Sequence, residues 1–391
     1  MGDIIHSLPA VAAVRQAFPS AMIGWAIEDR WAELISAPSA GQQGRSPAQP
    51  LADVVHRVNT RAWRSSPLSA ATRKEIKSVI TDLKKYRYEV AIDLQAAIRS
   101  AVLGRLSGAQ ARIGFAAPRE TLAKLFYTQT VRTPAAHVVE QGMQLAESIS
   151  GRNDLRIEFP LPCGAESESW CDAQLRDYGI SDFVMMNPGA GWGAKCWPVA
   201  RYGALAKEFK RSGLATIANV GPGEEGLAHE LEAASDGSTK AIFCSLAQLI
   251  ALTRRARLFV GGDTGPVHLA AAQSIPVVAI YGPTNPVRNG PYGPHGPNHG
   301  HFGAERFLNE TIRNRCSHGD NQLLRLDVPA KLRQNLFNHL RLHADQDDIS
   351  ILGSLQIVGS DRYSQFCAER PGPFFMSYSR RGEFGREQAV S

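Results

Sequence analysis

Short hydrophobic runs separated by amphipathic stretches predict alternating strands and helices over most of the chain. The runs at 183–186, 215–220 and 276–281 consist mainly of apolar residues, which is typical of strands buried on both faces. Stretches with helical spacing follow or precede each of these runs. The pattern therefore predicts an α/β fold built on parallel sheets.

The first half of the chain shows the same alternation and ends in a segment rich in proline and glycine. We expect strands at 22–26, 54–58, 89–93 and 111–115, and helices at 10–18, 96–106 and 138–149. The segment 153–168 predicts a linker, so we assign an N-terminal domain to 1–160 and a C-terminal domain to 165–345. Residues 346–391 have no sustained periodicity and are expected to be disordered.

The most informative stretch follows the apolar run Leu258–Val260. Gly261 and Gly262 end that run, and the sequence Asp263-Thr264-Gly265-Pro266 leads into a helical pattern rich in alanine. Proline suits the first turn of a helix, and glycine lets a ligand approach the backbone. The free amides and the helix dipole favour a phosphate group. An ordinary strand-to-helix turn is the alternative interpretation.

Three further loops contain candidate chemistry: Gly2–Asp3, Gly189–Lys195 and Gly221–Glu225. In the second loop, glycines and Lys195 suit a pyrophosphate, and in the third, Glu224 or Glu225 suits a ribose hydroxyl. Glycine turns with helix-capping acids are the alternative for both. None of the loops matches the glycine patterns of P-loop NTPases or of Rossmann dehydrogenases.

The amino-acid composition limits the classes of ligand and the cellular compartment that we expect. The 391 residues carry a net charge of +6, which suits anionic ligands but is too dispersed for nucleic acid. The six cysteines have neither paired spacing nor a metal-binding pattern, so we expect reduced thiols and no metal site. No membrane span or signal peptide is recognisable, and we expect a cytoplasmic protein.

A basic cluster in the first half has an unusual composition. Arg61 and Arg64 flank Trp63, and an aromatic residue between guanidinium groups suits a phosphate or a sugar. A solvated basic surface is the alternative interpretation for each of these side chains.

Seven segments, in this order, resemble the bacterial lipopolysaccharide heptosyltransferases: GDIIHSLPA, RAWR, DLQAAIRS, PRETLAKLFY, NPGAGWGAKCWP, GPGEE and DTGPVHLAAA. The resemblance covers about residues 1–293 and is greatest to the heptosyltransferase I group, which adds the first heptose to Kdo-lipid A. It implies a GT-B fold, in which two Rossmann-like domains face a cleft. It also implies an inverting transfer from ADP-L-glycero-β-D-manno-heptose without a metal or other cofactor.

The resemblance further implies roles for particular residues. Asp3 is the expected catalytic base, and Lys195 is expected to stabilise the departing ADP. The residues expected to bind the nucleotide sugar are Ala190, Gly191, Lys195, Glu224, Glu225, Asp263, Thr264, Gly265, Pro266 and His268. Arg61, Arg64 and Arg119 are expected to contact the acidic acceptor, with peripheral contact to the inner membrane.

One departure from the family pattern concerns the start of the chain. Members of the family have a strand before the segment that corresponds to Gly2–Asp3, and the first strand of the N-terminal domain is therefore expected to be missing here. This departure keeps a catalytically silent nucleotide-sugar-binding protein as an alternative. A heptosyltransferase II-like enzyme with another acceptor is the alternative within the family.

Overall fold

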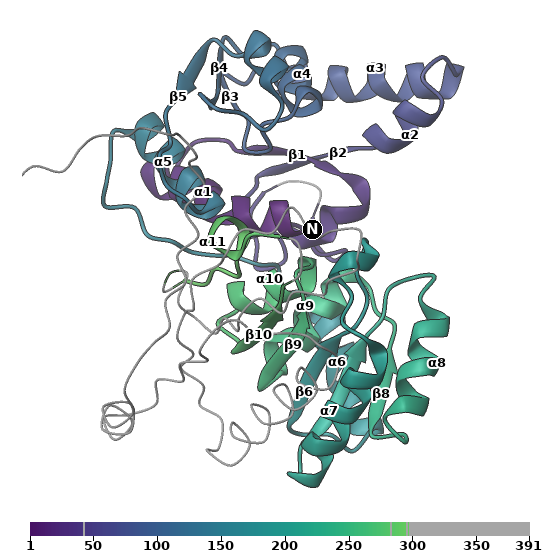
Figure 1. Ribbon diagram of the computed structural model, residues 1–391. Coiled ribbons are helices and arrows are strands. Elements are labelled where there is room, and N and C mark those ends of the chain that lie inside the picture. The colour runs from purple at the N-terminus through teal and green to yellow at the C-terminus, as the bar shows by residue number, and fades with distance from the viewer. Residues whose placement is uncertain (42–43, 282–283, 295, 297–391) are drawn as a thin grey trace, which may run out of the picture. The chain divides into compact units, whose positions relative to one another are not determined.

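The chain forms alternating helices and strands, and every pair of its named strands is parallel (Figure 1). The computed structural model describes residues 1–41, 44–281, 284–294 and 296. The expected tail at 346–391 and the end of the expected second domain lie outside these residues. The boundary between the two expected domains stays a prediction.

The second half contains one five-stranded sheet with the order β10-β9-β6-β7-β8. Its strands are β6 (Phe183–Asn187), β7 (Ala215–Asn219), β8 (Thr239–Ile242), β9 (Leu258–Gly262) and β10 (Val277–Ile280). Its helices are α6 (Ala165–Asp177), α7 (Val199–Arg211), α8 (Glu225–Ala234), α9 (Leu246–Arg255), α10 (Gly265–Ala272) and α11 (Pro286–Asn289). The sequence prediction of strands at β6, β7, β9 and β10 is confirmed.

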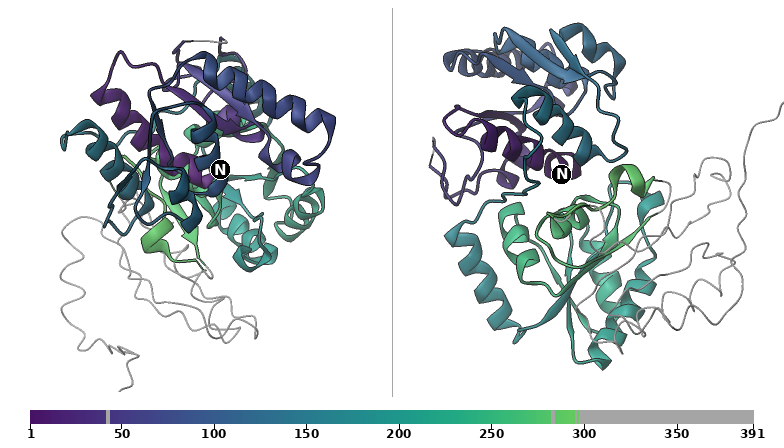
Figure 2. Two further views of the ribbon diagram at one scale, coloured as in Figure 1. Left: turned by 90° about the horizontal axis from the view of Figure 1, so that it is seen from above. Right: turned by 90° about the vertical axis from the view of Figure 1, so that its left-hand side faces the viewer.

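Helices cover both faces of this sheet, as Figure 2 shows. Alternate residues of β6 enter different hydrophobic clusters: Phe183 and Met185 pack with α9, whereas Val184 and Met186 pack with α7. The first strand of this half, β6, lies between β7 and β9. The strand order therefore reverses at β6, and in such sheets ligands bind beyond the carboxyl ends of the strands at this point.

The first half contains a two-stranded and a three-stranded sheet, with the orders β1-β2 and β3-β4-β5. The strands are β1 (Gly24–Glu28), β2 (Val54–Val58), β3 (Val90–Ile92), β4 (Ala111–Phe115) and β5 (Gln129–Val131). The α-helices are α1 (Gly2–Ala17), α2 (Thr60–Ser65), α3 (Ala70–Lys85), α4 (Ile98–Leu106) and α5 (Val138–Ser150). Three 3₁₀ helices complete the described elements: η1 (Asp29–Leu34), η2 (Thr121–Phe126) and η3 (Gly193–Lys195).

The expectation of a missing first strand is not tested by the described strands and stays a prediction. Val90 of β3 is 44% exposed.

Helix α1 begins at Gly2, so the turn predicted at Gly2–Asp3 is wrong. The amides of Ile4 and Ile5 donate to the carbonyl oxygen of Met1 at 3.0 and 3.2 Å, which closes the first helical turn. Ile5 and Leu8 are fully buried, and α1 packs against α5 and α10. Core packing therefore extends the helix to the start of the chain, and Asp3 lies on an ordered turn.

Several other predicted boundaries also differ from the structure by a few residues. The first strand runs over Gly24–Glu28, two residues later than expected. Helix α6 starts at Ala165, inside the expected linker 153–168. Glu166 and Glu168 lie in its first turn, where acidic side chains interact favourably with the helix dipole.

Close packing between α7 and α8 leads to a prediction about stability. A Cβ atom on Gly203 would lie 2.6 Å from the backbone carbon of Ala234, so Gly203→Ala should lower the free energy of unfolding by about 1–3 kcal/mol. Urea denaturation measures this change. Gly226→Ala is the matched control, because nothing lies within 4 Å of its Cβ position. That control should be stabilised by about 0.5–1 kcal/mol; equal effects of the two changes would contradict the packing argument.

Candidate functional site

The buried carboxylate of Asp263 is the centre of the candidate site. It follows β9, and it accepts hydrogen bonds from Lys195 Nζ at 2.7 Å and from Thr284 Oγ1 at 2.6 Å. His268 Nε2 lies 3.3 Å from its other oxygen. Segments that follow β6, β9 and β10 therefore meet at one carboxylate, at the edge where the topology places a ligand.

The partners of Asp263 keep this carboxyl group ionised. Burial alone favours its neutral form, but the hydrogen bonds and charge of His268, Lys195 and Thr284 outweigh burial and hold the pKa of Asp263 well below its usual range. The carboxylate is thus a fixed negative charge at any pH near neutrality. It holds the ammonium group of Lys195, which belongs to the segment that follows β6, at the end of β9.

His268 connects this carboxylate to the first helix of the chain. Its Nδ1 lies 3.2 Å from Nε2 of His6 in α1, and both rings are buried. A neutral His268 that donates from Nε2 to Asp263 accepts at Nδ1 from Nε2 of His6, whereas a protonated His268 donates from both nitrogens. Burial, followed by the proximity of His268 and His137, lowers the pKa of His6 well below 6.5. The result is a chain of hydrogen bonds that runs Asp263–His268–His6.

A third histidine lies beside this chain. His137 caps α5 by accepting a hydrogen bond from the amide of Val139 at Nδ1, and its Nε2 donates to the carbonyl oxygen of Gly290 at 3.0 Å. Its ring packs 4.7 Å from that of Tyr292 and 5.6 Å from that of His6. Both ring nitrogens are used when His137 is neutral, so this histidine supports the junction of α5 with the segment after α11.

The N-terminus of α10 has the features of an anion site. Thr264 is the N-cap residue, yet its hydroxyl donates to the carbonyl oxygen of Gly262 and makes no cap hydrogen bond. Pro266 has no N–H, and the amide of Val267 donates to the Thr264 carbonyl oxygen at 3.2 Å. The amides of Thr264 and Gly265 are therefore the donors that this turn can offer, together with the positive end of the helix dipole.

Glycine permits close contact between the start of α1 and the start of α10. A Cβ atom on Gly265 would lie 2.5 Å from the side chain of Met1, and one on Gly2 would lie 3.0 Å from the ring of His268. Larger residues at either position would separate the two helices. Both glycines come from segments that the sequence singles out, and these contacts place Asp3 one residue from the Asp263–His268 cluster.

Asp3 has an exposed side chain in the first turn of α1. Its carboxylate lies 3.6 Å from the guanidinium of Arg119, which precedes η2. An exposed pair of this kind contributes little to stability. The structure thus brings together two predicted site residues, the expected base and one expected acceptor contact, at a position open to solvent.

The glycine loops after β6 and β7 are joined by Glu224. Its carboxylate accepts a hydrogen bond from the amide of Gly221 at 2.7 Å and leaves no room for a Cβ atom on Gly189. Asn187, at the end of β6, donates to the carbonyl oxygen of Gly189 at 2.8 Å and lies 3.4 Å from the Thr264 hydroxyl. Glu224 therefore lies at the same sheet edge as Asp263.

The remaining predicted residues make fewer contacts with this cluster. Gly191 is exposed, Ala190 is half-buried, and the exposed Glu225 accepts a hydrogen bond from the amide of Gly223 at 3.3 Å. Arg61 and Arg64 are exposed on α2, three residues apart and so on one helix face. Their expected contact with an acceptor stays a prediction.

Sequence reasoning missed four residues that build the site: His6, Asn187, His137 and Thr284. His6 lies in the quoted GDIIHSLPA segment, but no role was assigned to it. A polar residue at the end of the apolar strand Phe183–Asn187 was a usable signal for Asn187. His137 and Thr284 carry no local signal, because their importance arises from contacts with distant segments.

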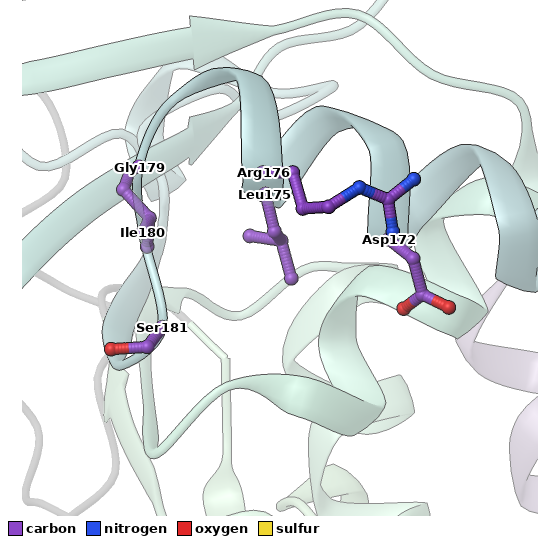
Figure 3. A pocket seen from close by; sticks show the side chains of 6 residues that line it. All are labelled: Asp172, Leu175, Arg176, Gly179, Ile180 and Ser181. Carbon is purple, nitrogen blue, oxygen red and sulfur yellow. The ribbon is translucent and has the colours of Figure 1, made fainter.

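The described residues contain no group of three or more His, Cys, Asp or Glu that could hold a metal ion. None of their helices is long and apolar enough to cross a membrane. An open pocket at the end of α6 shares no residue with the predicted site (Figure 3). It is lined by Asp172, Leu175, Arg176, Gly179, Ile180 and Ser181.

The sequence is similar to a known enzyme family. A family model described as glycosyltransferase family 9 (heptosyltransferase) matches residues 76–317. The chain is 31% identical over 305 residues to lipopolysaccharide heptosyltransferase 1 of Pseudomonas aeruginosa, which covers 75% of this chain and 79% of the relative. It is 29% identical to the Salmonella typhimurium enzyme of the same name, covering 75% of this chain and 89% of the relative.

The fold is similar to solved heptosyltransferase structures. The E. coli heptosyltransferase WaaC with ADP matches with a TM-score of 0.62 and 26% identity, covering 75% of this chain and 88% of the neighbour. The same enzyme with ADP-2-deoxy-2-fluoro heptose matches with a TM-score of 0.60 and 26% identity, covering 73% and 87%. The expected α/β fold of the GT-B type is thereby confirmed.

Acidification should destabilise the fold through His137. Burial lowers the pKa of His137 from 6.5 to about 4, so an unfolded chain binds a proton that the folded chain does not. The stability contributed by the neutral ring is complete above the unfolded pKa and is lost as the pH falls through the folded pKa. The loss is on the order of 3 kcal/mol.

His137→Asn tests this dependence, because asparagine retains an N-cap acceptor but does not titrate. The melting temperature should fall less steeply between pH 6.5 and about 4 in this variant than in the parent chain. Equal slopes would show that His137 is not the responsible group.

Proposed function

Because the chain belongs to glycosyltransferase family 9, the heptosyltransferases, we propose that it moves L-glycero-D-manno-heptose from ADP-heptose to Kdo-lipid A. In this proposal the transfer inverts the anomeric centre and proceeds without a metal ion. The names of the relatives support an acceptor in lipopolysaccharide, and the ligands of the solved neighbours support ADP-heptose as the donor. Such an acceptor implies work at the cytoplasmic face of the inner membrane.

The observation that carries this proposal is the meeting of two helix N-termini. The start of α10 offers the amides of Thr264 and Gly265 and the nearby cation Lys195, a combination that suits a diphosphate. The start of α1 offers the exposed carboxylate of Asp3. An anion site for the leaving group and a candidate base thus lie on facing segments, as a displacement at a sugar carbon requires.

The proposed reaction has one bond-forming and one bond-breaking event. Asp3 accepts the proton of the acceptor hydroxyl while that oxygen forms a bond to the anomeric carbon of heptose. The bond from this carbon to the β-phosphate oxygen breaks, and the electron pair leaves with ADP. Because attack comes from the face opposite ADP, the configuration inverts.

In this proposal Lys195 stabilises the departing diphosphate. Of its three N–H donors, two bind Asp263, at the carboxylate and at the backbone carbonyl oxygen. This leaves one N–H for a phosphate oxygen, in an orientation that the buried carboxylate fixes. Preorganised charge of this kind stabilises a transition state without the cost of reorienting water. Glu224, with one oxygen on Gly221, keeps the other for a ribose hydroxyl.

Replacement of the base gives the first test of this function. Asp3→Asn should lower acceptor-dependent ADP release by about a hundredfold to ten-thousandfold, because the proton acceptor is lost. Calorimetry should show unchanged ADP binding, since the side chain of Asp3 pairs with Arg119, which is not assigned to the nucleotide. Asp182→Asn is the matched control, because Asp182 forms a similarly exposed pair with Arg257 at 3.5 Å.

The same assay separates the alternatives. ADP binding without release from ADP-heptose, with any acceptor, would favour a silent nucleotide-sugar-binding protein. Release with an acceptor that already carries a heptose, but not with Kdo-lipid A, would favour a heptosyltransferase II-like enzyme. Full activity of Asp3→Asn would overturn the assignment of the base while leaving the family intact.

The basic face of α2 gives a second test. Changing both Arg61 and Arg64 to alanine should raise the KM for Kdo-lipid A by about tenfold or more, because guanidinium groups bind acidic sugars and phosphates through paired hydrogen bonds. The Kd for ADP-heptose should not change. The control changes both Arg73 and Lys77 of α3 to alanine, which removes the same positive charge from the adjacent helix. Equal effects of the two double variants would indicate general electrostatic attraction and contradict a specific acceptor site.

A further inference from the structure

The 3₁₀ helix η2 exposes two leucines beside the candidate base. Leu122 is 60% exposed and Leu125 is 77% exposed, among the largest values of any apolar side chain in the described residues. In a 3₁₀ helix, side chains three residues apart are eclipsed, so the two leucines project from the same face. Ala123, on another face, is fully buried and anchors the helix to the protein.

The surroundings of the two leucines carry positive charge. Arg119 and Lys124 are exposed next to them, whereas the carboxylate of Glu120 accepts a hydrogen bond from the amide of Ile98 at 2.7 Å and so caps α4. The carboxylate of Glu120 is thus used in a hydrogen bond to the protein's own backbone. An apolar projection with exposed cations at its base matches the boundary between acyl chains and anionic head groups.

The ion pair between Arg119 and Asp3 links this projection to the proposed site. The pair spans 3.6 Å, and only one residue separates Arg119 from the start of η2. A bilayer that receives Leu122 and Leu125 would therefore lie close to the carboxylate proposed as the base. This proximity suits an acceptor in which the sugar is attached directly to a lipid of the bilayer.

We propose that η2 is a membrane-docking element, in which Leu122 and Leu125 insert into the acyl region of an anionic bilayer and Arg119 and Lys124 contact its head groups. This inference rests on the proposed function for its choice of a lipid-linked acceptor. Docking holds the first turn of α1 at the membrane surface, so that the acceptor hydroxyl reaches Asp3 without leaving the bilayer. Two leucines and two cations give reversible, peripheral binding.

Flotation with lipid vesicles tests the docking element directly. The full chain should float with vesicles of phosphatidylethanolamine and phosphatidylglycerol, and changing both Leu122 and Leu125 to serine should weaken this binding by about tenfold or more. The matched control changes Phe243 and Val287 to serine, two side chains that are 49% and 44% exposed in the second half of the chain. The control should bind vesicles as the parent does, and circular dichroism should show that both variants are folded.

Activity measurements distinguish this inference from the function on which it rests. The leucine variant should lose turnover on Kdo-lipid A embedded in vesicles but keep turnover on a water-soluble Kdo acceptor without acyl chains. Vesicle binding is measured without any nucleotide sugar, so it remains informative even if no heptose transfer is found. Equal vesicle binding by the leucine variant and the parent would overturn the proposal. So would loss of a dimer in the leucine variant by sedimentation, since the leucines would then bind a second copy of the chain.

Discussion

The buried carboxylate of Asp263 is the interaction on which the candidate site depends. An ionised group is costly to bury unless it is paired, and Asp263 obtains its partners from the segments that follow β6, β9 and β10. Lys195 follows β6, Thr284 follows β10, and His268 lies in α10. Because the buried carboxylate is stable only with these partners, it fixes the relative positions of three loops at the carboxyl edge of the sheet.

The same constraint extends into the first half of the chain through His268. Its Nε2 lies beside the carboxylate of Asp263, and its Nδ1 lies within hydrogen-bond distance of Nε2 of His6 in α1. Apolar packing supports this polar contact, because Ile5 and Leu8 of α1 share a cluster with Val267 and Leu269 of α10. Asp3 owes its position to this combination, since its own side chain is exposed and its ion pair with Arg119 is exposed as well.

The separation of buried and exposed charge corresponds to a separation of tasks in a glycosyltransferase. Buried, fully paired groups hold the loops in place, and Asp263 and His268 belong to this class. Asp3, Arg61, Arg64 and Arg119 are exposed, and in the proposed function they contact ligands that arrive from solvent or from a membrane. Lys195 belongs to both, because it is half-buried and retains one donor.

The sequence by itself determined the local elements and the chemistry of the loops. Apolar runs and glycine turns predicted the strands of the second half, and the quoted motifs predicted the family and the GT-B fold. These features depend on interactions between residues that are close together in the sequence. Hydrophobic periodicity, turn preferences and helix-start signals are of this kind. Asp263, His268, Lys195 and Glu224 could be singled out for the same reason.

Only the tertiary structure decided how these residues combine. It made Gly2–Asp3 the first turn of a helix, because burial of Ile5 and Leu8 outweighs the turn preference of a Gly-Asp pair. It paired Lys195 with Asp263 and brought His6, Asn187 and Thr284 into the site. These outcomes rest on contacts between segments far apart in the sequence, and the cost of burying a charge or a polar group is set by what lies around it in space.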